Sequence, residues 1–297
     1  MSLPAKPLRR PLRRRIADRA INAVVRPLIL IAQLLPYPVR VRVFGQITTY
    51  LIAPVAGWRR RIRANLALVW PDMSKADVAH LLHAVPDHIG RSVIESYSPQ
   101  DLRARLDMLD VAGPGLNALR DAIMSGRPLI IVSGHIGNYA VFRAWLDREF
   151  GNVGALYSPL TNAAFNRHYT AAMADTGEPL FPRTHRGVVD MIQHLRSGHA
   201  VAMLFDQREA DGVDIPFLGQ PALVTLSPAE LALRHDAMLI AAYTIRQSDG
   251  LTFATWIEDA IPHSDPVTMM TALTQSLESQ VIAHPEQWLW THRRWRR

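Results

Sequence analysis

In the second half of the chain, short apolar runs alternate with amphipathic segments. The run 128–133 is apolar up to its final serine, which is typical of a strand buried on both faces. The segment 186–198 repeats its apolar residues with helical spacing and ends in a glycine, a common helix C-terminus. By these criteria we expect strands at 128–133, 199–206, 237–246 and 251–259, and helices at 139–150, 164–177, 186–198, 227–236 and 266–285.

This alternation predicts an α/β fold with a largely parallel central sheet flanked by helices. In such sheets, ligands collect beyond the carboxyl ends of the strands. His135 follows the first predicted strand and Asp206 ends the second. Both residues are therefore expected at the edge of the sheet where a ligand would bind.

The first part of the chain has a helical pattern instead. Residues 59–69 predict one amphipathic helix, which Trp70–Pro71 ends. Segments 74–85 and 87–97 predict two further helices, and the first of these opens with a capping-box arrangement.

Positive charge is concentrated at the start of the chain. Residues 1–63 hold fourteen Lys and Arg residues against a single acid, whereas the whole chain carries a formal charge of +7. The apolar runs 27–39 and 43–58 are each shorter than the ~20 residues that a helix needs to span a bilayer. This combination is typical of a monotopic region, with apolar faces in the membrane interface and arginines on anionic headgroups.

We therefore interpret 1–63 as a basic and apolar membrane-docking region on a cytoplasmic membrane face, where arginine is favoured. Two other interpretations are open: the arginines at 9–15 form a disordered tail, or the start of the chain is a targeting signal. The remaining 64–297 is expected to form the α/β domain, with 64–127 as a helical subdomain within it. The apolar content of 1–63 argues against a nucleic-acid partner.

Composition excludes several kinds of site. The chain has no cysteine, so disulfides and thiolate metal sites are absent. It has no glycine-rich phosphate loop, and its histidines lack the spacing of metal ligands. We therefore expect neither a cofactor nor a metal.

The segment 129–140, LIIVSGHIGNYA, carries the main candidate for chemistry. A histidine at the exposed end of a buried strand, just before a helix N-terminus, is well placed to take a proton from a substrate hydroxyl. Alone, this pattern also fits a structural histidine that only forms hydrogen bonds. The choice between the two depends on the rest of the chain.

This segment resembles the His-x-x-x-x-Asp/Glu motif of the lipid A late acyltransferases, within the lysophospholipid acyltransferase-like superfamily. Four further segments resemble the same family in the same order, including an Asp-Gln pair after a strand and a C-terminus rich in tryptophan. One position departs from the family, because Ala140 stands where the family has its carboxylate. The four segments are 61–74, 157–169, 206–234 and 284–296.

The resemblance implies a membrane-associated O-acyltransferase of the bacterial inner membrane. Such an enzyme moves a fatty acyl chain from acyl carrier protein or coenzyme A to the hydroxyl of a 3-hydroxyacyl chain on a lipid. The lipid acceptor would be a lipid A precursor or a lyso-aminolipid. His135 would be the general base, and backbone N–H groups near Gly137 and Asn138, together with a nearby arginine, would stabilise the oxyanion. Arg167 and Arg208 would bind substrate.

The alanine at position 140 leaves three explanations open, because a carboxylate normally holds the catalytic imidazole in its correct tautomer. The chain is an inactive variant, or Asp206 replaces the missing carboxylate, or the acceptor itself orients the base. Asp206 also fits a structural role, as a strand-end cap or a partner of Arg208. A non-catalytic lipid-binding protein with the acyltransferase fold is the alternative function.

Overall fold

The computed structural model describes residue 27 and residues 29–160 and 162–295. Its centre is a seven-stranded sheet with the order β1-β9-β8-β2-β5-β3-β4. Only β8 and β9 pair antiparallel, and the other neighbours are parallel, which confirms the predicted α/β fold. The strands are β1 (Asp110–Ala112), β2 (Leu129–Ser133), β3 (Gly154–Tyr157), β4 (Leu180–Pro182), β5 (Ala200–Leu204), β8 (Met238–Arg246) and β9 (Phe253–Ile257).

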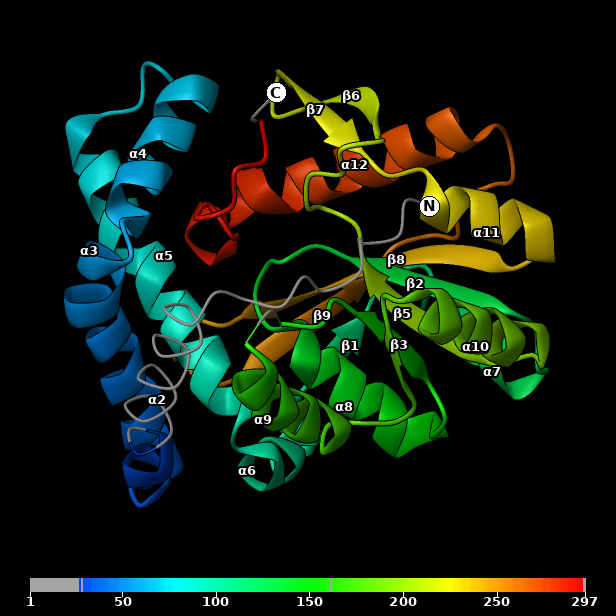
Figure 1. Cartoon of the computed structure of the whole chain (residues 1–297), viewed down its shortest axis with the longest axis horizontal. Coiled ribbons are helices and arrows are strands. Elements are labelled where there is room, and N and C mark those ends of the chain that lie inside the picture. The colour runs from blue at the N-terminus through cyan, green and yellow to red at the C-terminus, as the bar shows by residue number, and fades with distance from the viewer. Residues whose placement is uncertain (1–26, 28, 161, 296–297) are drawn as a thin grey trace.

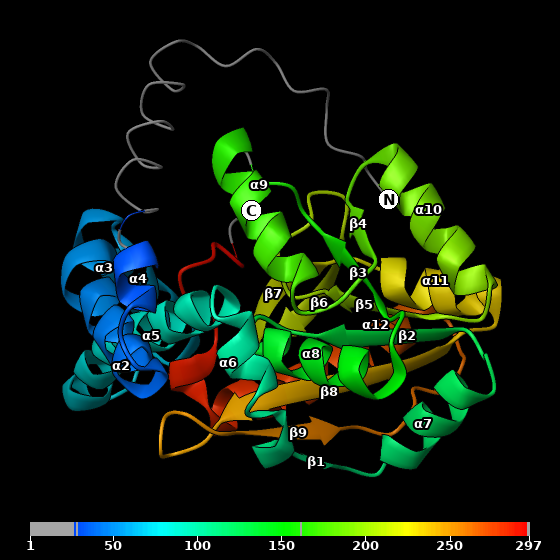
Figure 2. The same ribbon diagram turned by 90° about the horizontal axis from the view of Figure 1, so that it is seen from below.

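Side chains of β2 alternate between two apolar cores, one on each face of the sheet. Ile130 and Val132 pack with α10, α11 and α12, whereas Leu129 and Ile131 pack with α7 and α8. Helices therefore cover both faces (Figure 1; Figure 2), which is what a largely parallel sheet requires. These helices are α7 (Leu116–Met124), α8 (Tyr139–Phe150), α9 (Ala163–Ala174), α10 (His185–Arg196), α11 (Ser227–His235) and α12 (Pro266–Ala283).

A layer of helices from the first third of the chain stands beside the sheet (Figure 1). Its longest member, α5, packs against α2, η1 and α4. The approach is close, because a Cβ added at Gly90 of α5 would overlap Thr48. The layer comprises α2 (Tyr37–Ile47), the π-helix η1 (Thr48–Ile52), α3 (Ala53–Val55), α4 (Trp58–Val69), α5 (Lys75–Ser96), α6 (Pro99–Arg103) and the 3-10 helix η2 (Leu106–Met108).

The structure corrects two sequence predictions about elements. The helices expected at 74–85 and 87–97 form one helix, α5, which continues through Pro86. A proline inside a helix removes one hydrogen bond, but Pro86 is buried, and packing on both sides of it holds the helix together. The sequence also missed β1, β3 and β4, which are too short to show a period, and an antiparallel hairpin of β6 (Val213–Phe217) and β7 (Gln220–Val224).

The predicted docking region is described only from residue 27 onward, so its arginine-rich start lies outside the described residues. The boundary expected between 63 and 64 falls inside α4, and the division into two regions stays a prediction. In the described part of the chain, no helix combines the length and apolarity needed to cross a bilayer. Several large apolar side chains between residues 30 and 55 are nevertheless exposed: Leu30, Ile31, Leu34, Tyr50, Leu51 and Val55.

Candidate active site

The parallel pairing of β2 with β5 brings His135 and Asp206 together. Ser133 and Leu204 are paired in register at the carboxyl ends of the two strands, and the two site residues follow within two positions. His135 Nδ1 lies 2.6 Å from Asp206 Oδ1. The sequence placed both residues at this edge, and the structure adds the direct contact.

Asp206 is buried, and both of its carboxylate oxygens accept hydrogen bonds. Its Oδ2 accepts hydrogen bonds from the His135 backbone N–H at 2.8 Å and from Trp288 Nε1 at 2.9 Å. Burial alone would raise the pKa of Asp206, but attraction to the His135 imidazole and the hydrogen bonds from His135 and Trp288 outweigh it. The pKa falls from 3.8 to about 2, so the carboxylate is ionised beside the ring at neutral pH.

The imidazole of His135 is held on one side and open on the other. Its Nδ1 edge faces the buried Asp206, and the Tyr139 ring packs edge-on against it at 5.9 Å between centroids. The side chain remains 21% exposed, and its Nε2 lies 3.3 Å from the amide nitrogen of Gln207, an exposed residue. In this arrangement Nδ1 is hydrogen-bonded to the protein and Nε2 faces outward, where it could contact a substrate. A general base requires both features.

The turn that carries His135 is fixed by backbone hydrogen bonds to distant segments. Gly137 N–H donates to Gln287 O at 3.0 Å, and Asn138 N–H donates to Thr244 O at 3.0 Å. Gly137 has φ +58°, and a Cβ there would overlap Thr244 O, so the turn requires glycine. These two amides therefore have protein partners, and stabilisation of an oxyanion by the N–H groups near Gly137 and Asn138 stays a prediction.

Asn138 is buried and begins α8 rather than facing a substrate. Its Oδ1 accepts from the Ala140 N–H at 3.1 Å, an N-cap bond, and its Nδ2 donates to Glu95 Oε2 at 2.7 Å. The structure therefore gives Asn138 a positioning role in the turn. The substrate contact expected for this residue is not available to it.

Ala140 is buried in the first turn of α8. One of the three explanations for the missing carboxylate is that Asp206 replaces it. The structure shows the contact that this explanation requires. Asp206 already occupies Nδ1 of His135, so a carboxylate at position 140 is not needed to set the tautomer.

The two predicted substrate-binding arginines differ in position. Arg208 follows the site residue Asp206 closely, is half-buried, and donates its backbone N–H to His292 Nε2 at 3.1 Å. Arg167 is exposed on α9. Within the described residues, no hydrogen bond or ion pair joins Arg167 to His135 or Asp206. Substrate binding by either arginine stays a prediction.

A buried ion pair behind the turn was missed by sequence reasoning. Glu95 of α5 is fully buried and accepts from Arg246 Nη1 at 2.5 Å and from Nη2 at 2.6 Å. The same carboxylate accepts from Asn138, and Tyr37 donates to it at 3.4 Å. The pair therefore connects α2, α5 and β8 to the start of α8. The one sequence signal was an arginine at the end of an apolar strand.

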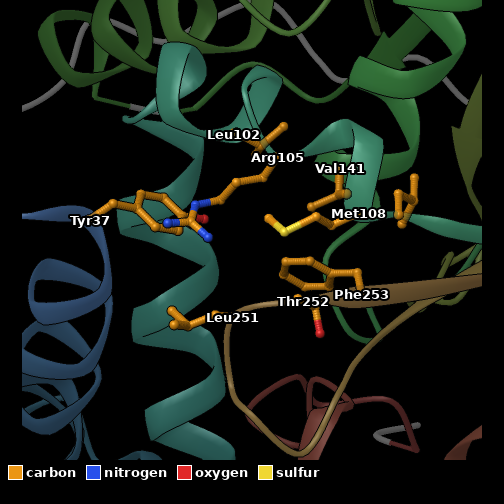
Figure 3. A pocket seen from close by; sticks show the side chains of 9 residues that line it. Tyr37, Leu102, Arg105, Met108, Val141, Leu251, Thr252 and Phe253 are labelled. Carbon is orange, nitrogen blue, oxygen red and sulfur yellow. The ribbon is translucent and has the colours of Figure 1, made fainter.

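Two cavities near this network are not lined by the candidate site. The first is lined by side chains from α2, α6, η2, α8 and β9 (Figure 3), with the Arg105 guanidinium 4.6 Å from the centre of the Tyr37 ring. It admits only about 10 Å³, roughly one water molecule, and so cannot hold an acyl chain as it stands. The second is a polar cleft of about 520 Å³ between α5, the β8–β9 turn and the 3-10 helix η3 (Pro285–Gln287).

Among the described residues, no cluster of His, Asp or Glu could hold a metal ion.

Comparison with known proteins decides the family. The family model of the bacterial lipid A biosynthesis acyltransferases matches residues 11–297. The chain belongs to this acyltransferase family. The match covers nearly the whole sequence, and it confirms the resemblance seen in the motifs.

Two kinds of acyltransferase are among the curated proteins similar to this chain. The phosphatidylinositol mannoside acyltransferase of Mycobacterium tuberculosis is 21% identical over 243 residues, covering 76% of this chain and 77% of the relative. That of Mycolicibacterium smegmatis is 23% identical over 265 residues, with 85% and 84% covered. The lipid A biosynthesis lauroyltransferase of Escherichia coli is 23% identical over 272 residues, with 88% and 87% covered.

Proposed function

We propose that this acyltransferase moves a fatty acyl group from a thioester to a hydroxyl of a lipid acceptor, with His135 as general base. The observation that carries the proposal is the 2.6 Å hydrogen bond between His135 Nδ1 and Asp206 Oδ1. A neutral ring that donates its Nδ1–H to Asp206 has an unprotonated Nε2, which is the state a general base needs. The names of the relatives, two mannoside acyltransferases and a lauroyltransferase, support acyl transfer to a glycolipid or a similar lipid.

In the proposed step, Nε2 of His135 takes the proton of the acceptor hydroxyl while the hydroxyl oxygen attacks the thioester carbonyl carbon. The carbonyl π electrons move to oxygen and form a tetrahedral oxyanion. When this intermediate collapses, the carbon–sulfur bond breaks, and the leaving thiolate takes the proton back from Nε2. The products are an ester and a free thiol. The ionised Asp206 stabilises the imidazolium between these two proton transfers.

The proposed reaction has two substrates, an acyl donor and a lipid acceptor. The donor is a fatty acyl thioester of acyl carrier protein or coenzyme A. The acceptor hydroxyl belongs to a 3-hydroxyacyl chain on a lipid A precursor or a lyso-aminolipid. The motifs between residues 61 and 296 support this, since they resemble enzymes of that reaction class.

We place the enzyme on the cytoplasmic face of the bacterial inner membrane, where α2, η1 and α3 meet the lipid. The support is the exposure of large apolar side chains in this layer, with Leu51 64% and Val55 92% exposed. α4 follows directly and begins with Trp58 and three arginines, Arg59–Arg61, a composition suited to the headgroup region. These segments lie together at one side of the molecule (Figure 1).

Replacing Leu51 and Val55 together with serine is expected to weaken binding to phosphatidylglycerol vesicles by about tenfold or more. Each side chain gains ~1.5–3 kcal/mol when fully buried, and ~1.4 kcal/mol corresponds to a tenfold change in affinity. Vesicle co-sedimentation measures the change. The matched control replaces Met124 and Ile282 with serine, because these residues are 80% and 62% exposed on α7 and α12. Equal loss of binding in both double variants would contradict docking through the helical layer.

The variant Ala140→Asp is expected to change the rate of acyl transfer by no more than about threefold, which is under 1 kcal/mol. Asp206 already bonds to Nδ1 of His135, so a second carboxylate has no tautomer left to set. Steady-state kinetics of both proteins with one thioester donor measures the change. The variant His135→Ala in the Ala140→Asp background controls for activity from another site. An increase in the rate of about a hundredfold or more would instead show that the alanine at position 140 impairs catalysis in the parent chain.

The function is tested by mass spectrometry of lipid extracts from cells that lack the gene and carry the wild-type or His135→Ala protein. The wild-type protein is expected to add a lipid heavier by one ester-linked fatty acyl group. If this heavier lipid is absent from the His135→Ala strain, its formation depends on His135, as the proposal requires. A lipid profile that is identical in all strains, with lipid still bound to the protein, would favour a non-catalytic lipid-binding protein.

A further inference from the structure

The proposed step creates an oxyanion, and two of the backbone donors expected for it are occupied. The amides of Gly137 and Asn138 donate to Gln287 O and Thr244 O, so they cannot turn to a substrate without opening the catalytic turn. The reaction nevertheless needs at least one hydrogen-bond donor close to His135 Nε2, where the reacting atoms meet. Among the described residues, the side chain of Gln207 meets this requirement.

Gln207 places its amide group at the open face of the base. Its Nε2 lies 3.3 Å from His135 Nε2, and the residue is exposed. Gln207 directly follows the buried Asp206 in the chain. Its backbone carbonyl accepts a hydrogen bond from Nη1 of the buried Arg294 at 3.4 Å. The main chain is therefore held in place while the side chain extends into the space where substrate must bind.

The hydrogen bonding of the ring decides which end of the Gln207 amide faces it. Asp206 can only accept, so a neutral His135 carries its proton on Nδ1 and has a lone pair on Nε2. A lone pair needs a donor, so Gln207 presents its NH₂ group and not its carbonyl. In the free enzyme, Gln207 thus occupies the position that the acceptor hydroxyl must take.

From this geometry we infer that Gln207 is a catalytic residue that donates to the oxyanion of the acyl thioester. The inference rests on the proposed function. The acceptor hydroxyl displaces the Gln207 NH₂ from His135 Nε2 and donates its own hydrogen bond there. The displaced NH₂ remains within about one hydrogen-bond length of the base, where the thioester carbonyl oxygen gains negative charge. No proton is transferred to or from the amide, so Gln207 acts only through hydrogen bonds.

The test compares Gln207→Ala and Gln207→Glu with the parent full-length enzyme, using a fatty acyl-coenzyme A donor and a hydroxylated lipid in vesicles. Gln207→Ala is expected to lower kcat by about 10²–10³-fold, the usual effect of losing one oxyanion donor, with little change in either KM. Gln207→Glu is expected to lose at least as much, since an ionised carboxylate has no hydrogen to donate. Gln275→Ala, at an exposed glutamine of α12, is the matched control and should keep the parent kcat.

The kcat effect separates catalysis from a structural role. Gln207 is exposed, so the variants are expected to keep the parent melting temperature and vesicle binding. A Gln207→Ala enzyme with kcat within about threefold of the parent, or with a change confined to KM, would overturn the inference and leave the proposed function intact. A parent enzyme that forms no ester would overturn both.

Discussion

Replacing Asp206 with asparagine is expected to lower kcat by about four orders of magnitude while the protein stays folded, as loss of the analogous carboxylate does in a serine protease. Asp206 Oδ2 accepts from two N–H groups, those of the His135 backbone and of Trp288. An asparagine must place its carbonyl oxygen there to satisfy both donors. Its NH₂ group then faces His135 Nδ1 and forces the proton onto Nε2. The ring would be in the tautomer that cannot accept a proton from a hydroxyl.

The measurement is steady-state acyl transfer, together with nitrogen NMR of the His135 ring to identify its tautomer. The matched control is Asp87→Asn, at a partly buried carboxylate that pairs with Arg91 of the same helix. This control should keep the parent rate, because Asp87 does not contact the imidazole. An Asp206→Asn rate within about tenfold of the parent would show that Asp206 has only a structural role at the end of the strand.

Breaking the buried ion pair behind the site is expected to have the largest effect on stability. Arg246→Met should lower the free energy of unfolding by about 3–5 kcal/mol, because it leaves the fully buried Glu95 charged and unpaired. The double variant Glu95→Gln with Arg246→Met should recover a large part of this loss. Its glutamine is neutral and still offers an oxygen to Asn138, which donates to Glu95 in the natural protein.

Urea denaturation of the three proteins measures these differences. The control is Arg148→Met, which breaks ion pairs with the exposed Asp107 and Glu149 and should cost no more than about 1 kcal/mol. A double variant as unstable as Arg246→Met would contradict the account, because the cost would then come from lost packing and not from an unpaired charge.

The sequence predicted the edge of the sheet that carries the site but not the contacts within it. Strand ends locate His135 and Asp206 because parallel neighbours end together. The direction of the Asp206 side chain depends on Trp288, which lies far along the chain and donates a hydrogen bond to the carboxylate. Local sequence contains no signal for such a contact.

The unpredicted partners of Gly137, Asn138 and Glu95 have the same physical origin. Gly137 and Asn138 stand at a helix start, where amides are usually free, but residues brought in by folding occupy both. Glu95 looks like a solvent-exposed glutamate in the helical pattern, and only the packing of α5 between the sheet and α2 buries it. Functional roles that depend on long-range partners were therefore beyond the reach of local patterns.

The most direct test follows one labelled acyl chain from a thioester to a hydroxylated lipid, in a single turnover of purified enzyme in anionic vesicles. Wild-type protein is expected to form the ester, and His135→Ala to form it about 10²–10⁴-fold more slowly while binding the vesicles equally well. Equal rates for the two proteins would show that the imidazole backed by Asp206 is not the base.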